Sequence, residues 1–186
     1  MYGMVNKAFE GLFRSRYGDE VWHRIREDAG VADEPFLSMK PYPDAITYGL
    51  VGSAEKILGV PGAELMDAFA DQWIEHQAVE GYGELLRSAG KTLPEFLRNL
   101  DQLHTRVKLA LPELEPPSFR VSDETEDGLV LDYFSERPGL SPLVAGLLRA
   151  LGPRFGLVVT STHREVEGPP RCVRFDVRWR AAREGD

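Results

Sequence analysis

Residues 171–180 read RCVRFDVRWR, and their alternation decides how the last third of the chain folds. From Val173 on, every second residue is apolar and those between are charged, as in a strand with one buried and one solvated face. The segment therefore predicts a strand. Its apolar positions are Val173, Phe175, Val177 and Trp179.

Three further segments upstream have the same strand-like character: SFRVSD at 118–123, GLVLDYFS at 128–135 and GLVVTSTHREV at 156–166. A helical segment, SPLVAGLLRALG at 141–152, separates the last two. Strands joined by short turns or by one helix favour an antiparallel arrangement. We therefore expect a roughly four-stranded antiparallel sheet with a helix packed against one face.

The first two thirds of the chain instead show apolar residues at helical spacing. The longest regular pattern, TLPEFLRNLDQLHTRVKLALPEL at 92–114, predicts one continuous helix from about 93 to 111, ended by Pro112. The fold class is therefore α+β, with a helical part over about 1–112 and a sheet-containing part over about 113–182. Because no low-complexity linker interrupts the 186 residues, we expect a single domain over 1–186.

Composition narrows the class of protein. The formal net charge is −8 and the sequence pI about 5.1, which disfavours nucleic acid and anionic membranes as partners. The first 13 residues contain Lys7 and Glu10, so they do not resemble a secretory signal, and no run approaches the roughly 20 apolar residues of a membrane helix. Cys172 is the one cysteine, so we expect a cytoplasmic protein without disulfides. We also expect that no output domain is attached.

The strand at 128–135 continues into YFSERPGL, residues 133–140, where an apolar face becomes polar. Tyr133, Ser135 and Arg137 follow Leu129 and Leu131 at the spacing of one strand face. Two hydroxyls and a guanidinium suit an anion site. The alternative is that the strand runs out into solvent, where these residue types are ordinary.

Other candidate groups are few. His23 with Glu27, and His76 with Glu80, lie four apart on expected helices and could hold a metal, although exposed charge pairs are far commoner. No GxSxG, HExxH, CxxC or Walker pattern occurs, and no acid, base and nucleophile set is recognisable. We therefore expect a protein that is not an enzyme.

His104 stands four residues after Leu100 and three before Val107, on or beside the apolar stripe of its helix. A histidine there is either a satisfied core residue or a ligand. One imidazole cannot build a structural zinc site but can hold a haem iron from one side. A haem also carries two carboxylates, which the hydroxyls and guanidinium of Tyr133, Ser135 and Arg137 would complement.

Several stretches together resemble the haem nitric oxide/oxygen-binding (H-NOX) domains, which include the haem domain of the soluble guanylate cyclase β subunit. They are MYGMVNKA, YGDEVW, GYGELL, LPEFLRNLDQLH, PPSF, and Y-x-S-x-R followed by PGL and GLL. They span nearly the whole chain in the family's order, and the match is to the stand-alone bacterial type. The Y-x-S-x-R motif, with a histidine about thirty residues upstream, is its most specific element.

The resemblance implies a haem b held between the helical part and the sheet. His104 would be the proximal iron ligand, Pro117 would press on the macrocycle and distort it, and the propionates would meet the Y-x-S-x-R side chains. Those side chains are Tyr133, Ser135 and Arg137. The residues expected to line the pocket are Val5, Phe9, Trp73, Leu103, Leu143 and Leu147.

The expected choice of gas follows from the residues on the distal side of the haem, opposite His104. Family members that hold O2 use a distal tyrosine, and the matching position here is Leu143, or Pro142 in an alternative alignment, neither of which can donate a hydrogen bond. We therefore expect binding of NO, and of CO, although the indole N–H of Trp73 is a possible donor.

The resulting hypothesis is a gas sensor. NO would bind opposite His104, weaken the iron–histidine bond and release the helix at 93–111, so that a partner in trans reads the change. The resemblance implies a histidine kinase or a cyclic-dinucleotide enzyme as that partner. The alternatives are an O2 or redox haem sensor, a haem-free module that binds another carboxylate ligand, and a pure interaction protein.

Overall fold

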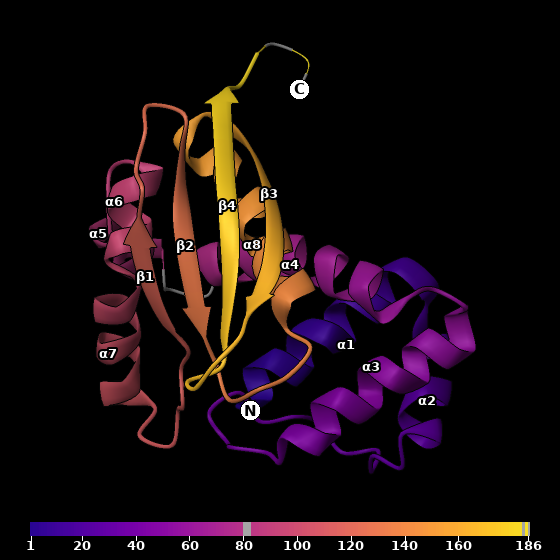
Figure 1. The fold of residues 1–186 in the computed structure, drawn as a ribbon. Helices are drawn as coiled ribbons and strands as arrows, with labels where there is room; N and C mark the ends of the chain where they lie inside the picture. Colours follow the sequence, from indigo (N-terminus) through magenta and orange to yellow (C-terminus); the bar gives the residue numbers. More distant parts are fainter. Residues whose placement is uncertain (80–82, 184, 186) are drawn as a thin grey trace. The chain divides into compact units, whose positions relative to one another are not determined.

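The computed structural model describes the backbone of residues 1–79, 83–183 and 185, and the side chains of these residues except 76–79 and 85. The chain divides into two compact units, Met1–Trp73 and Ile74–Asp186. The first is helical and the second carries the sheet (Figure 1). Helices up to Ala110 followed by strands from Ser118 confirm the α+β class.

Unit 1 contains α1 (Gly3–Tyr17), α2 (Asp19–Asp28), α3 (Asp44–Leu58) and most of α4 (Gly62–Val79). Gly18 separates the first two helices with a φ of 85°, a backbone conformation that side chains with a Cβ rarely adopt. Aromatic side chains dominate the core: Phe9 stacks on Phe69 at 3.9 Å between ring centroids, and Phe13 lies 6.1 Å from Trp22. These contacts hold α1 against α2 and α4.

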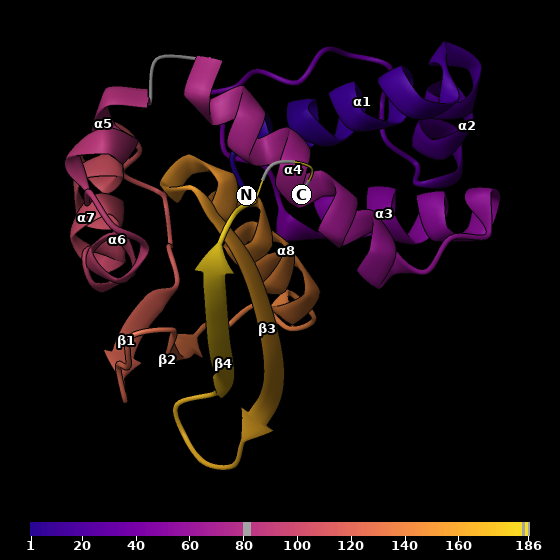
Figure 2. The ribbon, with the colours of Figure 1, turned by 90° about the horizontal axis from the view of Figure 1, so that it is seen from above.

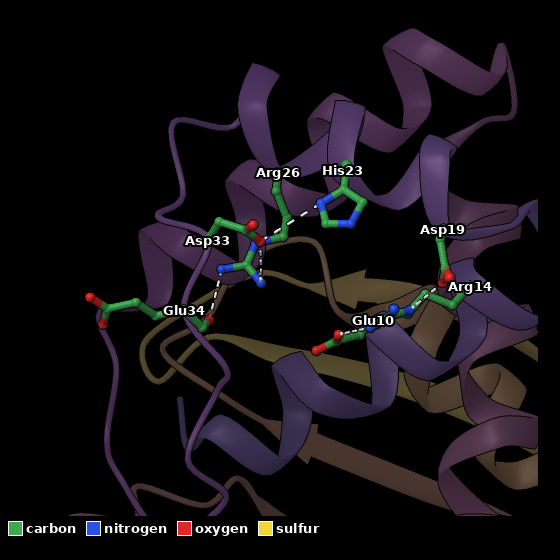
Figure 3. Close-up of polar contacts among 7 residues, drawn as sticks. All are labelled: Glu10, Arg14, Asp19, His23, Arg26, Asp33 and Glu34. Atoms are coloured by element: carbon green, nitrogen blue, oxygen red, sulfur yellow. Dashed lines mark hydrogen bonds and ion pairs between the residues drawn. The ribbon is translucent and has the colours of Figure 1, made fainter.

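Two arginines hold in place the segments that follow α1 and α2 in this unit (Figure 3). Arg14 of α1 donates to Glu10 at 2.7 Å and to Asp19, the first residue of α2, at 2.6 Å. Arg26 is only 5% exposed, and its Nη2 donates to the Glu34 carbonyl at 2.8 Å. Arg26 thereby fastens the segment after α2 onto that helix.

The helices of unit 2 include α5 (Gly83–Ser88), α6 (Leu93–Arg98), α7 (Leu100–Ala110) and α8 (Ser141–Leu151), with a 3-10 turn at Gly152–Phe155. Thr92 caps α6, because its hydroxyl accepts from the Glu95 N–H at 3.3 Å. The prediction of one helix over 93–111 was wrong, because the helix breaks at Asn99. The side-chain amide of Asn99 donates to the carbonyl of Ala89, ten residues earlier in sequence, at 2.8 Å, a bond made outside the helix.

The sheet confirms the predicted four antiparallel strands, in the order β1-β2-β4-β3. Their bounds are β1 (Ser118–Ser122), β2 (Gly128–Phe134), β3 (Leu157–Val166) and β4 (Cys172–Ala181). Helix α8 lies on one side of the sheet, as the view from above shows (Figure 2). Its buried residues Val144 and Leu148 join the core formed by Leu131 and Phe175.

Alternation gives the sheet two different faces. The inner face packs against the helices and carries Phe119, Tyr133, Val173 and Phe175. The outer face carries Arg120, Asp132, Arg174 and Arg164, which are aligned across the four strands. Tyr133 and its neighbour Asp132 therefore point to opposite sides of β2.

Asp132 and Arg174 form an ion pair on the outer face. Arg174 donates to both carboxylate oxygens of Asp132, through Nε at 2.7 Å and Nη2 at 2.8 Å. Asp132 is 6% exposed, and the Arg174 hydrogen bond holds the pKa of its carboxyl below the usual range. The charges of Arg120 and Arg164 lower this pKa further.

Candidate functional site

A cavity of about 110 Å³ lies in unit 2 beside the end of β2. A space of this size admits carboxylate groups, since a water in the liquid takes roughly 30 Å³. Both hydroxyls and the guanidinium singled out in YFSERPGL line it, together with two charged residues of other segments. The lining residues are Tyr133, Ser135, Arg137, Gly139, Leu140, Ser141, Glu165, Arg171 and Val173.

The structure brings Tyr133, Ser135 and Arg137 together, although β2 ends at Phe134 and the last two lie beyond the strand. The backbone N–H of Arg137 donates to the Ser135 hydroxyl at 3.1 Å, which turns the chain into the cavity wall. The Arg137 Nη1 donates to the Glu115 carbonyl at 2.6 Å, while the exposed Glu115 carboxylate is 4.0 Å from Nη2.

Tyr133 supplies a neutral hydroxyl to this cavity. The side chain is 4% exposed, and burial raises the pKa of its phenol, against the opposing effects of the Ser135 hydrogen bond and the charges of Arg137 and Arg171. The hydroxyl therefore stays protonated at neutral pH and can donate to an anion. The cavity combines hydroxyl and guanidinium donors, which is the donor set a carboxylate requires.

His104 connects to this cavity through an aromatic contact. Its ring on α7 lies 5.8 Å from that of Phe119 on β1, which in turn lies 5.5 Å from that of Tyr133 on β2. The Nδ1 atom of His104 is buried, and none of the described residues makes a hydrogen bond to it. A buried polar atom left in this way costs about 1–3 kcal/mol and needs a functional explanation.

The ionisation of His104 also suits a metal ligand. Burial lowers the pKa of the imidazole, while the charge of Asp101 and the backbone of Pro117 act in the opposite direction. The ring is therefore neutral at neutral pH, which is the form that donates a lone pair to a metal. Pro117, the last residue before β1, is near enough for its backbone to raise this pKa through a hydrogen bond to the imidazole.

The expected pocket residues fall into both units. Leu103 is buried in the unit 2 core, and Leu143 and Leu147 lie half-buried one turn apart on α8. Val5, Phe9 and Trp73 belong to unit 1, where Phe9 and Trp73 both contact the ring of Phe69, at 3.9 and 5.7 Å between centroids. Their role in a common pocket stays a prediction.

The two histidine pairs have different outcomes. His23 lies 3.7 Å from Asp33, which rests on the loop after α2, so its ionic contact is not with the expected Glu27 (Figure 3). The pair of His76 and Glu80 lies outside the residues whose side chains are described. Over the described part of the chain, no three metal-ligating side chains gather into a cluster.

Sequence reasoning missed Glu165 and Arg171, the other charged residues of the cavity. Val173 pairs with Tyr133 on one side and with Glu165 on the other, so the three form a row across the inner face. Arg171 stands immediately before β4. The order and register of the strands would have pointed to both residues. Strand order and register cannot be read from a local sequence pattern.

The chain matches one known protein family over most of its length. The profile of the family described as "Haem-NO-binding" matches residues 2–163. The chain belongs to that family. Proteins with these H-NOX domains bind haem and sense diatomic gases, and the domain itself is a sensor without catalytic activity.

Curated relatives of this H-NOX chain include two from Caenorhabditis elegans. Soluble guanylate cyclase gcy-32 is 33% identical over 86% of this chain and 24% of its own length, and gcy-35 is 31% identical over 83% and 23%. The chain thus spans about a quarter of the length of these relatives.

Solved structures show the same fold. The unliganded Fe(II) H-NOX protein from K. algicida has a TM-score of 0.87 at 20% identity, with both chains fully covered. The Fe(II)NO form of an H-NOX protein from S. oneidensis has a TM-score of 0.83 at 18% identity, over 97% of this chain and 99% of that one. Among the described helices of the present chain, none has the length and apolar character needed to cross a bilayer.

Proposed function

We propose that this H-NOX chain is a haem-based sensor of NO, which also binds CO, with His104 as the proximal ligand of haem b. The observation that carries the proposal is the buried, unpartnered Nδ1 of His104, whose ring is linked through Phe119 to the Tyr133 cavity. The imidazole of α7 and the phenol of Tyr133 thus flank the same inner-face ring, which suits a cofactor with a metal centre and an acidic edge.

Each residue has a specific task in this proposal. His104 provides a neutral imidazole, while Tyr133, Ser135 and Arg137 hold the propionates through hydroxyl and guanidinium donors. Pro117, beside the imidazole, restrains the macrocycle, and the six predicted apolar and aromatic pocket residues exclude water. The bound haem supplies an open coordination position for a diatomic gas.

The preference for NO rests on α8. Leu143 and Leu147 present only aliphatic surface, so neither can donate the hydrogen bond that stabilises polar bound O2. NO and CO depend far less on such a donor. The indole of Trp73 is the one predicted pocket residue with an N–H, and it marks the O2-sensing alternative.

The break at Asn99 suggests how the site communicates. Leu93, Phe96 and Leu97 anchor α6 in the core, whereas α7, which carries His104, contributes only Leu103 to the buried set. A change of force on His104 can therefore move α7 with little disturbance of α6. The moved surface would be read by a partner such as a histidine kinase or a cyclic-dinucleotide enzyme.

Absorption spectra of the purified, haem-reconstituted ferrous protein test this function directly. A Soret band that shifts on addition of NO and of CO, but not on exposure to air, is the expected result. A stable new spectrum in air would instead support an O2 sensor. Absence of any Soret band after reconstitution would overturn the haem proposal and leave a carboxylate-binding module.

A further inference from the structure

The carboxylate cavity contains a second guanidinium that the Y-x-S-x-R motif does not include. Arg171, in the segment between β3 and β4, lines the cavity together with Tyr133, Ser135 and Arg137. Its Nη2 donates to Oε1 of Glu165 at 3.0 Å. Glu165 lines the same cavity, so this ion pair lies in its wall rather than on a remote surface.

Strand pairing fixes the position of this ion pair. Glu165 is the second-last residue of β3 and pairs with Val173 of β4, whose other neighbour is Tyr133 of β2. Glu165 and Tyr133 thus stand on the same face with one strand between them, at about 4.8 Å per strand spacing. Arg171 precedes β4 directly, and Val166 pairs with Cys172 beside it.

The two guanidinium groups of the cavity suit a ligand with more than one carboxylate. Arg137 and Arg171 contribute two positive charges and Glu165 one negative charge, while Tyr133 is neutral. One guanidinium can satisfy one carboxylate, and a second carboxylate nearby needs a second cation. A guanidinium has five N–H donors, so Arg171 can remain bonded to Glu165 through Nη2 and still donate elsewhere.

We propose that Arg171, oriented by Glu165, is a second carboxylate-binding residue that contacts a haem propionate beside Arg137. This inference rests on the proposed function, because it takes the haem to be the ligand. Glu165 then has two opposing effects: it orients Arg171 and it repels the incoming carboxylate. The competing explanation is that the two residues form only an ion pair that braces the hairpin.

The two explanations predict different effects of one variant, Glu165→Gln, on the loss of haem. Removal of either residue breaks a brace, so Arg171→Ala and Glu165→Gln would then have equal effects. If Arg171 binds a propionate, Arg171→Ala removes attraction. Glu165→Gln removes repulsion and keeps an amide oxygen that can still accept from Arg171 and orient it. Arg178→Ala is a matched control, because Arg178 is also an exposed arginine of the β4 region paired with an acid, Asp127, at 3.4 Å.

The test measures the rate at which each reconstituted protein loses haem to an excess of apomyoglobin. We expect loss about threefold to tenfold faster for Arg171→Ala, the range of a partly exposed charged hydrogen bond. Loss from Glu165→Gln should be unchanged or slower, and loss from Arg178→Ala unchanged. Equal acceleration in Arg171→Ala and Glu165→Gln, or no acceleration in Arg171→Ala, would overturn the proposal.

Reconstitution with haem dimethyl ester provides a second readout, because the ester removes both carboxylate charges. Wild type and Arg171→Ala should then release the cofactor at the same rate, and a persisting difference would contradict carboxylate binding by Arg171. A wild type without any Soret band would defeat the proposed function itself. A normal wild-type band with equal variant effects would defeat only the role of Arg171.

Discussion

The two faces of strand β2 use arginine for different purposes. On the outer face, Arg174 is matched by two hydrogen bonds to the 6%-exposed carboxylate of Asp132, a residue of the same chain. On the inner face, Arg137 borders a cavity with hydroxyls beside it, and the carboxylate of Glu115 is 4.0 Å away and largely exposed. The outer arrangement is complete within the chain, whereas the inner one offers donors to a ligand.

This difference separates stability from binding. A charge pair formed within the fold contributes to unfolding free energy, and breaking it leaves a poorly solvated charge behind. A set of donors around a cavity contributes mainly to the affinity for whatever enters. Substitutions on the inner face should therefore change haem binding with small effects on the apo fold, and those on the outer face the reverse.

The largest expected effect is that of His104→Gly. Loss of the imidazole should reduce haem affinity about 100-fold or more, because even supporting residues of metal ligands are worth 10–100-fold. Added imidazole should restore the ferrous Soret band. His23→Gly is the control, since His23 is an exposed helical histidine of unit 1. A His104→Gly spectrum identical to wild type without imidazole would refute the assignment.

Arg137→Ala should have the next largest effect on the inner face. Loss of a charge-assisted bond to a propionate is expected to speed haem release about tenfold. The urea midpoint of the apo protein should change little, because the Glu115 carbonyl that accepts from this guanidinium is near solvent. If affinity and apo stability fall in parallel, the inner face is structural and the contrast between the faces fails.

Asp132→Asn probes the outer face. Loss of the charged, two-bond contact with Arg174 should lower the unfolding free energy by about 1–2 kcal/mol at pH 7, with haem release unchanged. Urea titrations of the apo protein and haem transfer measured on the same samples give both quantities. A faster haem release from this variant would show that the faces are coupled.

The pH dependence sharpens this prediction. The pKa of Asp132 is lower in the folded chain than the usual value of about 3.9, so its charge stabilises the fold above that pH. The stabilisation is lost as the pH falls from about 4 through the folded pKa. The difference in unfolding free energy between wild type and Asp132→Asn should therefore shrink between pH 5 and pH 2.

Arg120→Ala should have the smallest effect of the set. Arg120 is exposed on the outer face, with its guanidinium 5.6 Å from the centroid of the Phe134 ring. Removal of this contact is expected to lower the unfolding free energy by about 0.5 kcal/mol. Haem transfer should match wild type, and a clear change in transfer would mean that the outer face participates in binding.

Much of the fold was predictable because its signals are local. The alternation of RCVRFDVRWR and the helical spacing of SPLVAGLLRALG correctly predicted β4 and α8, and the structure confirmed four antiparallel strands. The prediction of one helix over 93–111 was wrong at Asn99. The side chain of Asn99 donates a hydrogen bond to Ala89, ten residues earlier in sequence, and this bond outweighs a continuous apolar stripe. Helical spacing contains no information about such a distant acceptor.

The candidate site was likewise predictable only in part. The residue types of His104, Tyr133, Ser135 and Arg137, with their spacing and family motif, were sufficient to nominate them from the sequence alone. Only the tertiary structure decided that a ring contact through Phe119 links His104 to the cavity, that its Nδ1 is buried without a partner, and that Arg171 and Glu165 line the same wall. The physical reason is that chain-local spacing sets which face a side chain takes, whereas strand order and register, which depend on packing of the whole core, set its neighbours.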